Sequence, residues 1–141
     1  PDRKPAVGLL MDGSTRARAS LVAPIIKPDS IVAMAALATE VVVDESVMQY
    51  LSDIVDATRS NKDVVLGVSM RGAMALARAI KTWAITQGRT YATPDDVREL
   101  ATYVLAHRMV LDPESEFAGV KATDIIERIL VDIEPPAYRA A

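Results

Sequence analysis

The sequence predicts a mainly α-helical domain: a small bundle of about five helices with two or three very short strands. Three observations support this class. Apolar residues recur at helical spacing in several long segments, helix-start residues precede those segments, and the β-branched runs are short. The chain has 141 residues, of which 50% are hydrophobic, so it is long enough to bury a core without disulfide or metal crosslinks.

The first half of the chain contains the first two predicted helices. Residues 29–39 form an alanine-rich helix with Pro28 near its first turn. The β-branched residues at 40–43 predict a small strand, and Asp44 is a good N-cap for the next helix. In residues 45–60 the apolar positions recur at i, i+4, i+7 and i+8, so this helix should bury one side.

Residues 64–80, VVLGVSMRGAMALARAI, indicate a strand, a tight turn and a helix. The helix is expected over residues 69–87, with Ser69 as its N-cap and Gly88 ending it. Apolar side chains cover most of its circumference, so we expect it to be the central helix. Trp83 continues the apolar face and is expected in the core rather than as a stacking platform.

A strong helix start follows a short extended stretch at residues 90–92. Thr93 is the expected N-cap, Pro94 the first helical residue and Asp96 the third, a combination typical of a capped start. This helix should end near His107, where a cation interacts favourably with the helix dipole. Arg108 is a second cation at this helix end. Another short strand at residues 109–111 and, after a loop, a last helix at 123–133 then follow.

Composition excludes several classes of protein. No cysteine is present, and His107 is the single histidine, so thiolate and transition-metal sites lack their usual ligands. A net charge of −3 with few aromatic residues argues against a nucleic-acid surface. No apolar run approaches the roughly 20 residues needed to cross a bilayer, and no membrane partner is expected. A cytoplasmic location is compatible with the absence of cysteine.

Ser69 invites comparison with the G-x-S-x-G nucleophile turn of hydrolases, since Gly67 stands two residues before it. The fifth position, however, is Arg71, where a bulky side chain replaces the glycine that a tight backbone approach requires. The remaining sequence also supplies no parallel sheet to support such a turn. Ser69 is therefore better interpreted as an N-cap whose hydroxyl accepts from a free amide at Arg71 or Gly72.

Arg71 is the more informative residue. A cation in the first helical turn faces the positive end of the dipole and costs roughly 0.3–1 kcal/mol unless something offsets it. A nearby carboxylate or exposure to water would do so, and so would a bound phosphate contacted by the guanidinium and the helix-start amides. The other basic and sulfur-containing side chains of these helices are expected to be solvated charges (Arg59, Arg78, Lys81) and gap-filling core residues (Met48, Met70, Met74).

Three blocks in this order resemble the C-terminal lid of MoxR-type AAA+ ATPases: YLSDIVDATR at 50–59, LGVSMRGAMALARAIKTWAITQGRTYATPDDV at 66–97 and VLAHRMVL at 104–111. The resemblance extends over roughly residues 22–136. It implies a helical lid at residues 21–141, preceded at residues 1–20 by a linker from an N-terminal AAA+ core that is missing here. The first residue, Pro1, fits a piece of a longer protein.

In that family the arginine of the corresponding turn is the sensor-2 residue, which contacts the ATP γ-phosphate. Arg71 matches this place, with Ser69 and Met70 at the helix start, although the family usually has proline where Met70 stands. The chain has no Walker A lysine, Walker B acids or arginine finger. The resemblance therefore implies that the parent protein is an ATPase that binds ATP and Mg²⁺, whereas this chain alone holds neither and contains no catalytic or metal-binding residue.

The resemblance also implies partners: the protein's own AAA+ core, the neighbouring subunits of a hexameric ring, and a client such as a metalloenzyme or a von Willebrand A-domain protein. The implied role is chaperone-like remodelling or maturation of that client. The alternative is a helical adaptor, histone-fold-like at its TPDDV helix start (93–97), that binds protein or DNA. Its surface would be the basic stripe of Arg71, Arg78 and Lys81.

Overall fold

The computed structural model describes residues 22–137, so the expected linker at residues 1–20 and its boundary lie outside the described residues. The chain divides into two compact units, residues 1–33 and 34–141, and the division falls inside the first described helix, α3 (Pro28–Thr39). In the first unit the description covers residues 22–33, most of which are exposed. All the other elements belong to the second unit.

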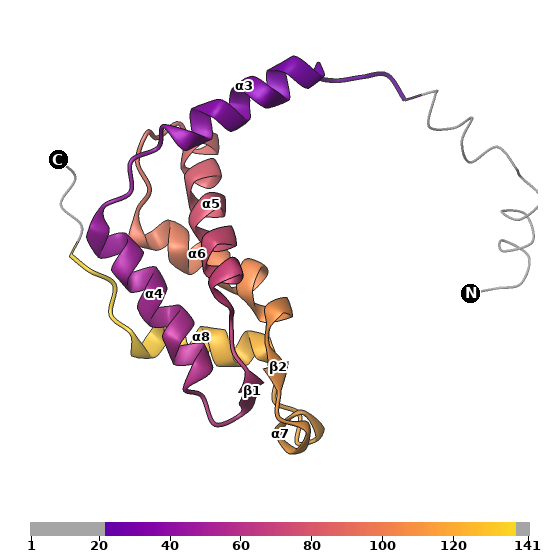
Figure 1. The fold of residues 1–141 in the computed structure, drawn as a ribbon, viewed down its shortest axis with the longest axis vertical. Coiled ribbons are helices and arrows are strands. Elements are labelled where there is room, and N and C mark those ends of the chain that lie inside the picture. The colour runs from indigo at the N-terminus through magenta and orange to yellow at the C-terminus, as the bar shows by residue number, and fades with distance from the viewer. Residues whose placement is uncertain (1–21, 138–141) are drawn as a thin grey trace, which may run out of the picture. The chain divides into compact units, whose positions relative to one another are not determined.

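The mainly α-helical class is confirmed, with six α-helices and one two-stranded antiparallel sheet in residues 22–137 (Figure 1). After α3 the elements are α4 (Glu45–Arg59), β1 (Val64–Leu66), α5 (Met70–Thr86), α6 (Pro94–Leu105), the 3₁₀ turn η1 (Ala106–Arg108), β2 (Val110–Leu111), α7 (Pro113–Phe117) and α8 (Ala122–Asp132).

Two details of the predicted order differ. Residues 40–43 form no strand; Val42 makes an isolated parallel bridge to Tyr91, in the stretch predicted to be extended. The segment expected to be a loop before the last helix contains α7, a short helix that begins at Pro113 and is capped by Asp112, whose carboxylate accepts from the amides of Glu114 and Ser115.

The core lies among α4, α5, α6 and α8. Its largest fully buried side chains come from all four helices: Ile54, Leu76, Ile80, Leu105, Ile125 and Ile126. α4 and α6 each pack against the other three of these helices, whereas α5 packs against α4 and α6. α5 is buried along one stripe, which includes Leu76 and Ile80, so the prediction of a central helix covered over most of its circumference is wrong.

The predicted helix ends are confirmed. Asp44 caps α4 by accepting from the amide of Ser46 at 2.8 Å. At the end of α5, Gly88 adopts φ 71°, and its N–H donates to the carbonyl of Ile85 at 2.8 Å. The next amide, of Arg89, donates to the carbonyl of Ala84 at 2.9 Å, which completes a Schellman motif.

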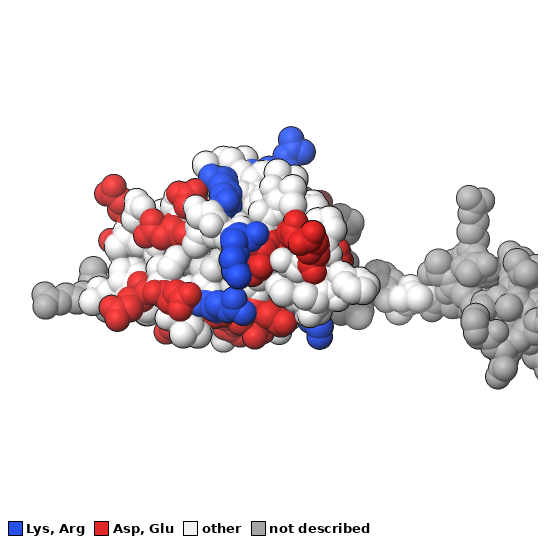
Figure 2. Space-filling view, turned by 90° about the horizontal axis from the view of Figure 1, so that it is seen from below, with Lys and Arg blue, Asp and Glu red and all other residues white. Residues whose placement is uncertain are grey.

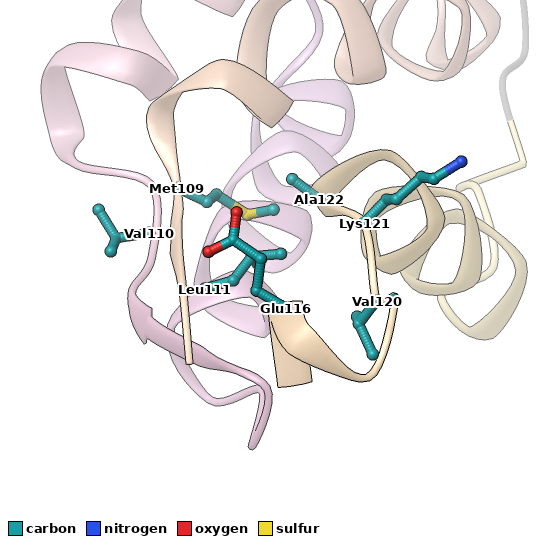
Figure 3. Close-up of a pocket in the computed structure, with 8 residues that line it drawn as sticks. Met109, Val110, Leu111, Glu116, Val120, Lys121 and Ala122 are labelled. Atoms are coloured by element: carbon teal, nitrogen blue, oxygen red, sulfur yellow. The ribbon is translucent and has the colours of Figure 1, made fainter. Parts of the chain in front are cut away.

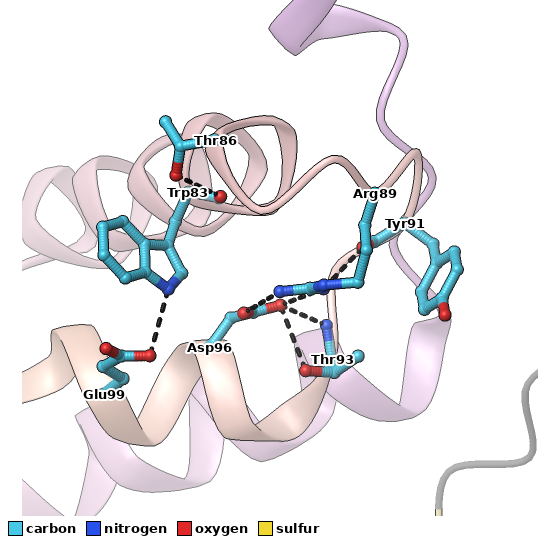
Figure 4. Close-up of polar contacts among 7 residues, drawn as sticks. All are labelled: Trp83, Thr86, Arg89, Tyr91, Thr93, Asp96 and Glu99. Atoms are coloured by element: carbon cyan, nitrogen blue, oxygen red, sulfur yellow. Dashed lines mark hydrogen bonds and ion pairs between the residues drawn. The ribbon is translucent and has the colours of Figure 1, made fainter.

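The carboxylate of Asp96 holds the start of α6 (Figure 4). From the sequence, Asp96 was predicted only as part of the capped helix start. Asp96 is 3% exposed, and it accepts from the backbone N–H of Thr93 at 2.7 Å and from Arg89 Nη1 at 2.9 Å. Burial opposes ionisation of this carboxyl group, but the hydrogen bonds from Arg89 and Thr93 outweigh it and hold its pKa below the ordinary value. Arg89 and Asp96 thus connect the end of α5 to the start of α6.

Trp83 is not a core residue, so that prediction is wrong. The indole is only half-buried, and its N–H donates to Glu99 Oε2 at 3.0 Å in an exposed contact across α5 and α6 (Figure 4). Within residues 22–137, no helix combines the length and the apolar character that crossing a bilayer requires.

Candidate functional site

The residues singled out by the sequence lie together at the start of α5. Ser69 has extended backbone (φ −75°, ψ 164°), and its hydroxyl accepts from the N–H of Gly72 at 3.4 Å. The Ser69 carbonyl also accepts from the N–H groups of Gly72 and Ala73, at 2.9 and 3.1 Å. Ser69 is thus the N-cap, as predicted, and Met70 is the first helical residue with 62% of its surface exposed.

Arg71 lies in the first turn of α5 with its side chain exposed. Among residues 22–137 no acceptor forms a hydrogen bond or an ion pair with it, and the first turn of α5 contains no acidic residue. The backbone N–H groups of Met70 and Arg71 likewise have no acceptor in the described part of the chain. This helix start therefore presents donors and a positive charge that the described residues do not offset, and an anion fits it.

The chain around this helix start is closely packed. Val68 is fully buried just before the cap, and its side chain lies over Gly72. A Cβ atom at position 72 would lie 2.6 Å from Val68 Cγ1 and 3.2 Å from Arg108 Cδ. Only glycine fits there without a shift, and the first turn of α5 is consequently fixed by contacts on its inner side.

Arg59 was expected to be a solvated charge, and its side chain is 41% exposed, but it also makes contacts that were not predicted. Its Nε donates to the carbonyl of Val68 at 2.8 Å, and its Nη1 pairs with Asp56 Oδ1 at 2.9 Å. Thr58, in the last turn of α4, is fully buried, and its hydroxyl accepts from the N–H of Val68 at 3.0 Å. The sequence signal for these contacts was Thr58 and Arg59 in the last turn of one helix and Gly67 shortly before the next.

An apolar groove of about 210 Å³ runs beside this helix start, between α4 and α5. Met48, Met70 and Met74 line it together with smaller apolar side chains, and Arg59 and Asp56 lie among its lining residues. Met70 and Met74 are 62% and 49% exposed, so the prediction that they fill gaps in the core is wrong. They instead form an adaptable apolar surface next to Arg71.

The remaining basic residues are spread over other contacts. Arg78 is exposed two turns after Arg71, and the ammonium of Lys81 donates to the carbonyl of Thr39 at 3.4 Å. Arg108 Nε donates to the carbonyl of Val104 at 2.9 Å, as expected of a cation at a helix end, and His107 is exposed. The face shown in Figure 2 intersperses Lys and Arg with Asp and Glu, so no extended basic surface forms there.

A separate hollow of about 560 Å³ lies between β2, α7 and the start of α8 (Figure 3). Its walls combine polar and apolar surface, with Met109, Val120 and Glu116 among them, and Lys121 extends away from it in this view. None of the three predicted site residues at the start of α5 lines it. In residues 22–137 no group of three or more His, Cys, Asp or Glu side chains is placed to hold a metal ion.

The sequence of this chain is similar to parts of longer bacterial proteins. YeaC of Bacillus subtilis, an uncharacterised protein, is 36% identical over 118 residues, which cover 84% of this chain and 37% of YeaC. Chaperone MoxR1 of Mycobacterium tuberculosis is 28% identical over 70% of this chain and 28% of its own length. The chain thus spans about a third of the length of these relatives.

A solved structure leads to the same family. A protein of Cytophaga hutchinsonii assigned as an ATPase superposes with a TM-score of 0.67 and 30% identity, covering 70% of this chain and 33% of that one. The sequence profile of the AAA lid domain matches residues 56–129, which contain the start of α5 and Arg71. This chain belongs to the AAA lid domain family.

Proposed function

We propose that this chain is the nucleotide-sensing, sensor-2 lid of a MoxR-like AAA+ ATPase, and that Arg71 contacts the γ-phosphate of ATP. One observation carries the proposal: an exposed arginine without an acceptor in the described chain, in the first turn of a closely packed helix start. A guanidinium and free helix-start amides suit a phosphoryl group, because both supply N–H donors and positive charge.

Arg71 couples nucleotide state to lid position because it is part of a fixed unit. The segment before it is joined to α4 by the close approach of Gly67 to Arg59 and by the backbone hydrogen bonds of Val68, so a pull on the guanidinium is passed on to α4. Charge-assisted hydrogen bonds of this kind each contribute roughly 1.5–3 kcal/mol. When the terminal phosphoryl group leaves, Arg71 loses its acceptor and the lid is released.

The rest of the nucleotide site is proposed for the parent protein. The chain has no G-x-x-x-x-G-K-[ST] phosphate loop, so we assign the binding of ATP and Mg²⁺ to a separate nucleotide-binding core. The match covers 37% of YeaC, and the rest of such a relative is long enough to contain a core of this kind. The apolar methionine groove beside Arg71 is suited to pack against that core, because an exposed apolar surface next to a ligand contact marks an interface.

The proposed assembly is a hexameric ring in the cytoplasm, in which lid movements exert force on a client. A relative named as a chaperone, MoxR1, supports a chaperone-like role. The ChlI subunit of magnesium chelatase of Anabaena variabilis, 39% identical over 43% of this chain, is part of a metal-inserting enzyme by its name. The proposed client, a metalloenzyme or a von Willebrand A-domain protein, rests on the resemblance of the sequence to MoxR-type ATPases.

The test is ATP turnover by the full-length protein with Arg71→Ala. The loss of one charge-assisted contact predicts a rate about 10- to 100-fold lower. Arg78→Ala is the matched control, since Arg78 is also exposed on α5, and it should stay within about twofold of the wild type. An unchanged rate in Arg71→Ala would contradict the proposal. Salt-sensitive binding of duplex DNA by this chain would favour the helical adaptor instead.

A further inference from the structure

The last turn of α4 holds both backbone polar groups of Val68. The N–H of Val68 donates to Thr58 Oγ1 at 3.0 Å, and the carbonyl of Val68 accepts from Arg59 Nε at 2.8 Å. Two consecutive side chains of one helix thus bind the N–H and the carbonyl of one residue in the segment that leads into α5. We call this arrangement the Val68 clamp, made by Thr58 and Arg59.

Each side chain of the Val68 clamp is itself held in place. Thr58 is fully buried, and its hydroxyl donates to the carbonyl of Val55 at 2.6 Å, which leaves a lone pair for the N–H of Val68. The guanidinium of Arg59, whose side chain is 41% exposed, also pairs with Asp56 Oδ1 at 2.9 Å. The Thr58 half of the clamp is therefore a buried, preorganised hydrogen bond, and Arg59 adds a second bond at its exposed edge.

Gly67 allows the two segments to approach closely enough for these bonds. A Cβ atom at position 67 would lie 2.7 Å from Arg59 Cα and 2.7 Å from Arg59 N, which are backbone atoms that cannot move aside on their own. The Val68 clamp thus needs a side chain with a hydroxyl, an arginine and a glycine at three defined positions. Shape alone would not require the hydroxyl.

The Val68 clamp acts three residues before Arg71, and Ser69 and Met70 continue directly into the helix. A change in the position of the Val68 backbone would redirect the first turn of α5 and with it the guanidinium. We propose that Thr58 and Arg59 are positioning residues for Arg71. Their hydrogen bonds to Val68 connect α4 to the helix start that holds the phosphate contact. This inference rests on the proposed function of Arg71.

The first test needs no nucleotide. Amide hydrogen exchange at Val68 in this chain should speed up on the order of tenfold in Thr58→Val, which removes the acceptor but keeps the shape. Thr58→Ser keeps the hydroxyl and should restore slow exchange. Exchange at Val68 that is equally slow in Thr58→Val would overturn the inference.

The second test measures ATP turnover by the full-length protein in a double-mutant cycle. Thr58→Val and Arg59→Gln should each lower the rate on the order of tenfold when Arg71 is present, because small displacements of a contact group are costly. In the Arg71→Ala background they should change it by less than about twofold, since the group that they position is gone. Thermal unfolding of each variant is the control for folding. If Thr58→Val does not fold, Arg59→Gln still tests the inference.

The matched control is Arg98→Gln. Arg98 also donates to a backbone carbonyl, that of Leu130 at 2.7 Å, but it joins α6 to α8 away from the start of α5. Its effect on turnover, of whatever size, should be the same with and without Arg71. Equal effects of the clamp variants in both backgrounds, or none, would refute the positioning role and leave the function of Arg71 standing. If Arg71→Ala itself had no effect, both proposals would fall.

Discussion

The buried carboxylate at the start of α6 offers a quantitative test of how this domain is held together. Asp96→Asn keeps the size of the side chain and removes its charge. Four hydrogen bonds converge on the carboxylate, two from Arg89 and two from Thr93, and the side chain is 4% exposed. In the amide variant one oxygen is replaced by a donor that faces the donors of Arg89.

The magnitude follows from this geometry. Removing one partner of a buried ion pair costs roughly 3–5 kcal/mol of stability. Arg89 keeps 24% of its side chain exposed, and water can solvate part of the charge that is left, so the low end of that range applies. We expect about 3 kcal/mol, which for a domain of this size lowers Tm by about 10 °C or more.

The assay is urea and thermal unfolding of the 141-residue chain. Asp95→Asn is the matched control, because Asp95 lies in the same helical turn but is exposed and has no hydrogen bond or ion pair among the described residues. It should change stability by no more than about 0.5 kcal/mol. If Asp96→Asn lowers the free energy of unfolding no more than Asp95→Asn does, the buried ion pair does not stabilise the start of α6.

The pH dependence has a defined sign. The pKa of Asp96 lies below its ordinary value of 3.8 in the folded state, so the folded protein stays ionised where the unfolded chain takes up a proton. Its stabilisation is fully present above that ordinary value and disappears as the pH falls through the lower folded pKa. The gap between the wild type and Asp96→Asn should therefore close in strong acid and stay constant near neutrality.

Two further substitutions test individual contacts. Gly67→Ala places a methyl group against the backbone of Arg59 and should destabilise the chain by about 1–3 kcal/mol in urea unfolding; unchanged stability would show that the approach is not close. Trp83→Phe removes one exposed hydrogen bond to Glu99 and should cost no more than about 1 kcal/mol, and a larger loss in thermal unfolding would mean that the indole is a core residue after all.

Features that depend on neighbours in sequence were predictable. Asp44, Ser69 and Thr93 were recognised as helix starts and Gly88 as a helix end, because capping depends on residues within one turn. The helix α7 carried the same kind of signal, since Asp112 and Pro113 form a capped start, but its five residues are too few to show a periodic pattern.

Features that depend on contacts between segments were not predictable. Arg59 is an ordinary charged residue in its own helix, and its contact with Val68 exists only because α4 and the segment before α5 come together. Trp83 lies on an apolar stretch, but the side that it occupies faces Glu99 and water rather than the core. Periodicity shows that a stretch is apolar, and packing decides which of its side chains are buried.

The central claim, that Arg71 distinguishes ATP from ADP, is tested most directly by nucleotide affinity. Binding of a non-hydrolysable ATP analogue and of ADP should be measured by calorimetry for the full-length protein and for Arg71→Ala. We predict that the substitution weakens binding of the ATP analogue about 10-fold or more and leaves ADP binding within about twofold. Equal weakening of both nucleotides, or of neither, would contradict it.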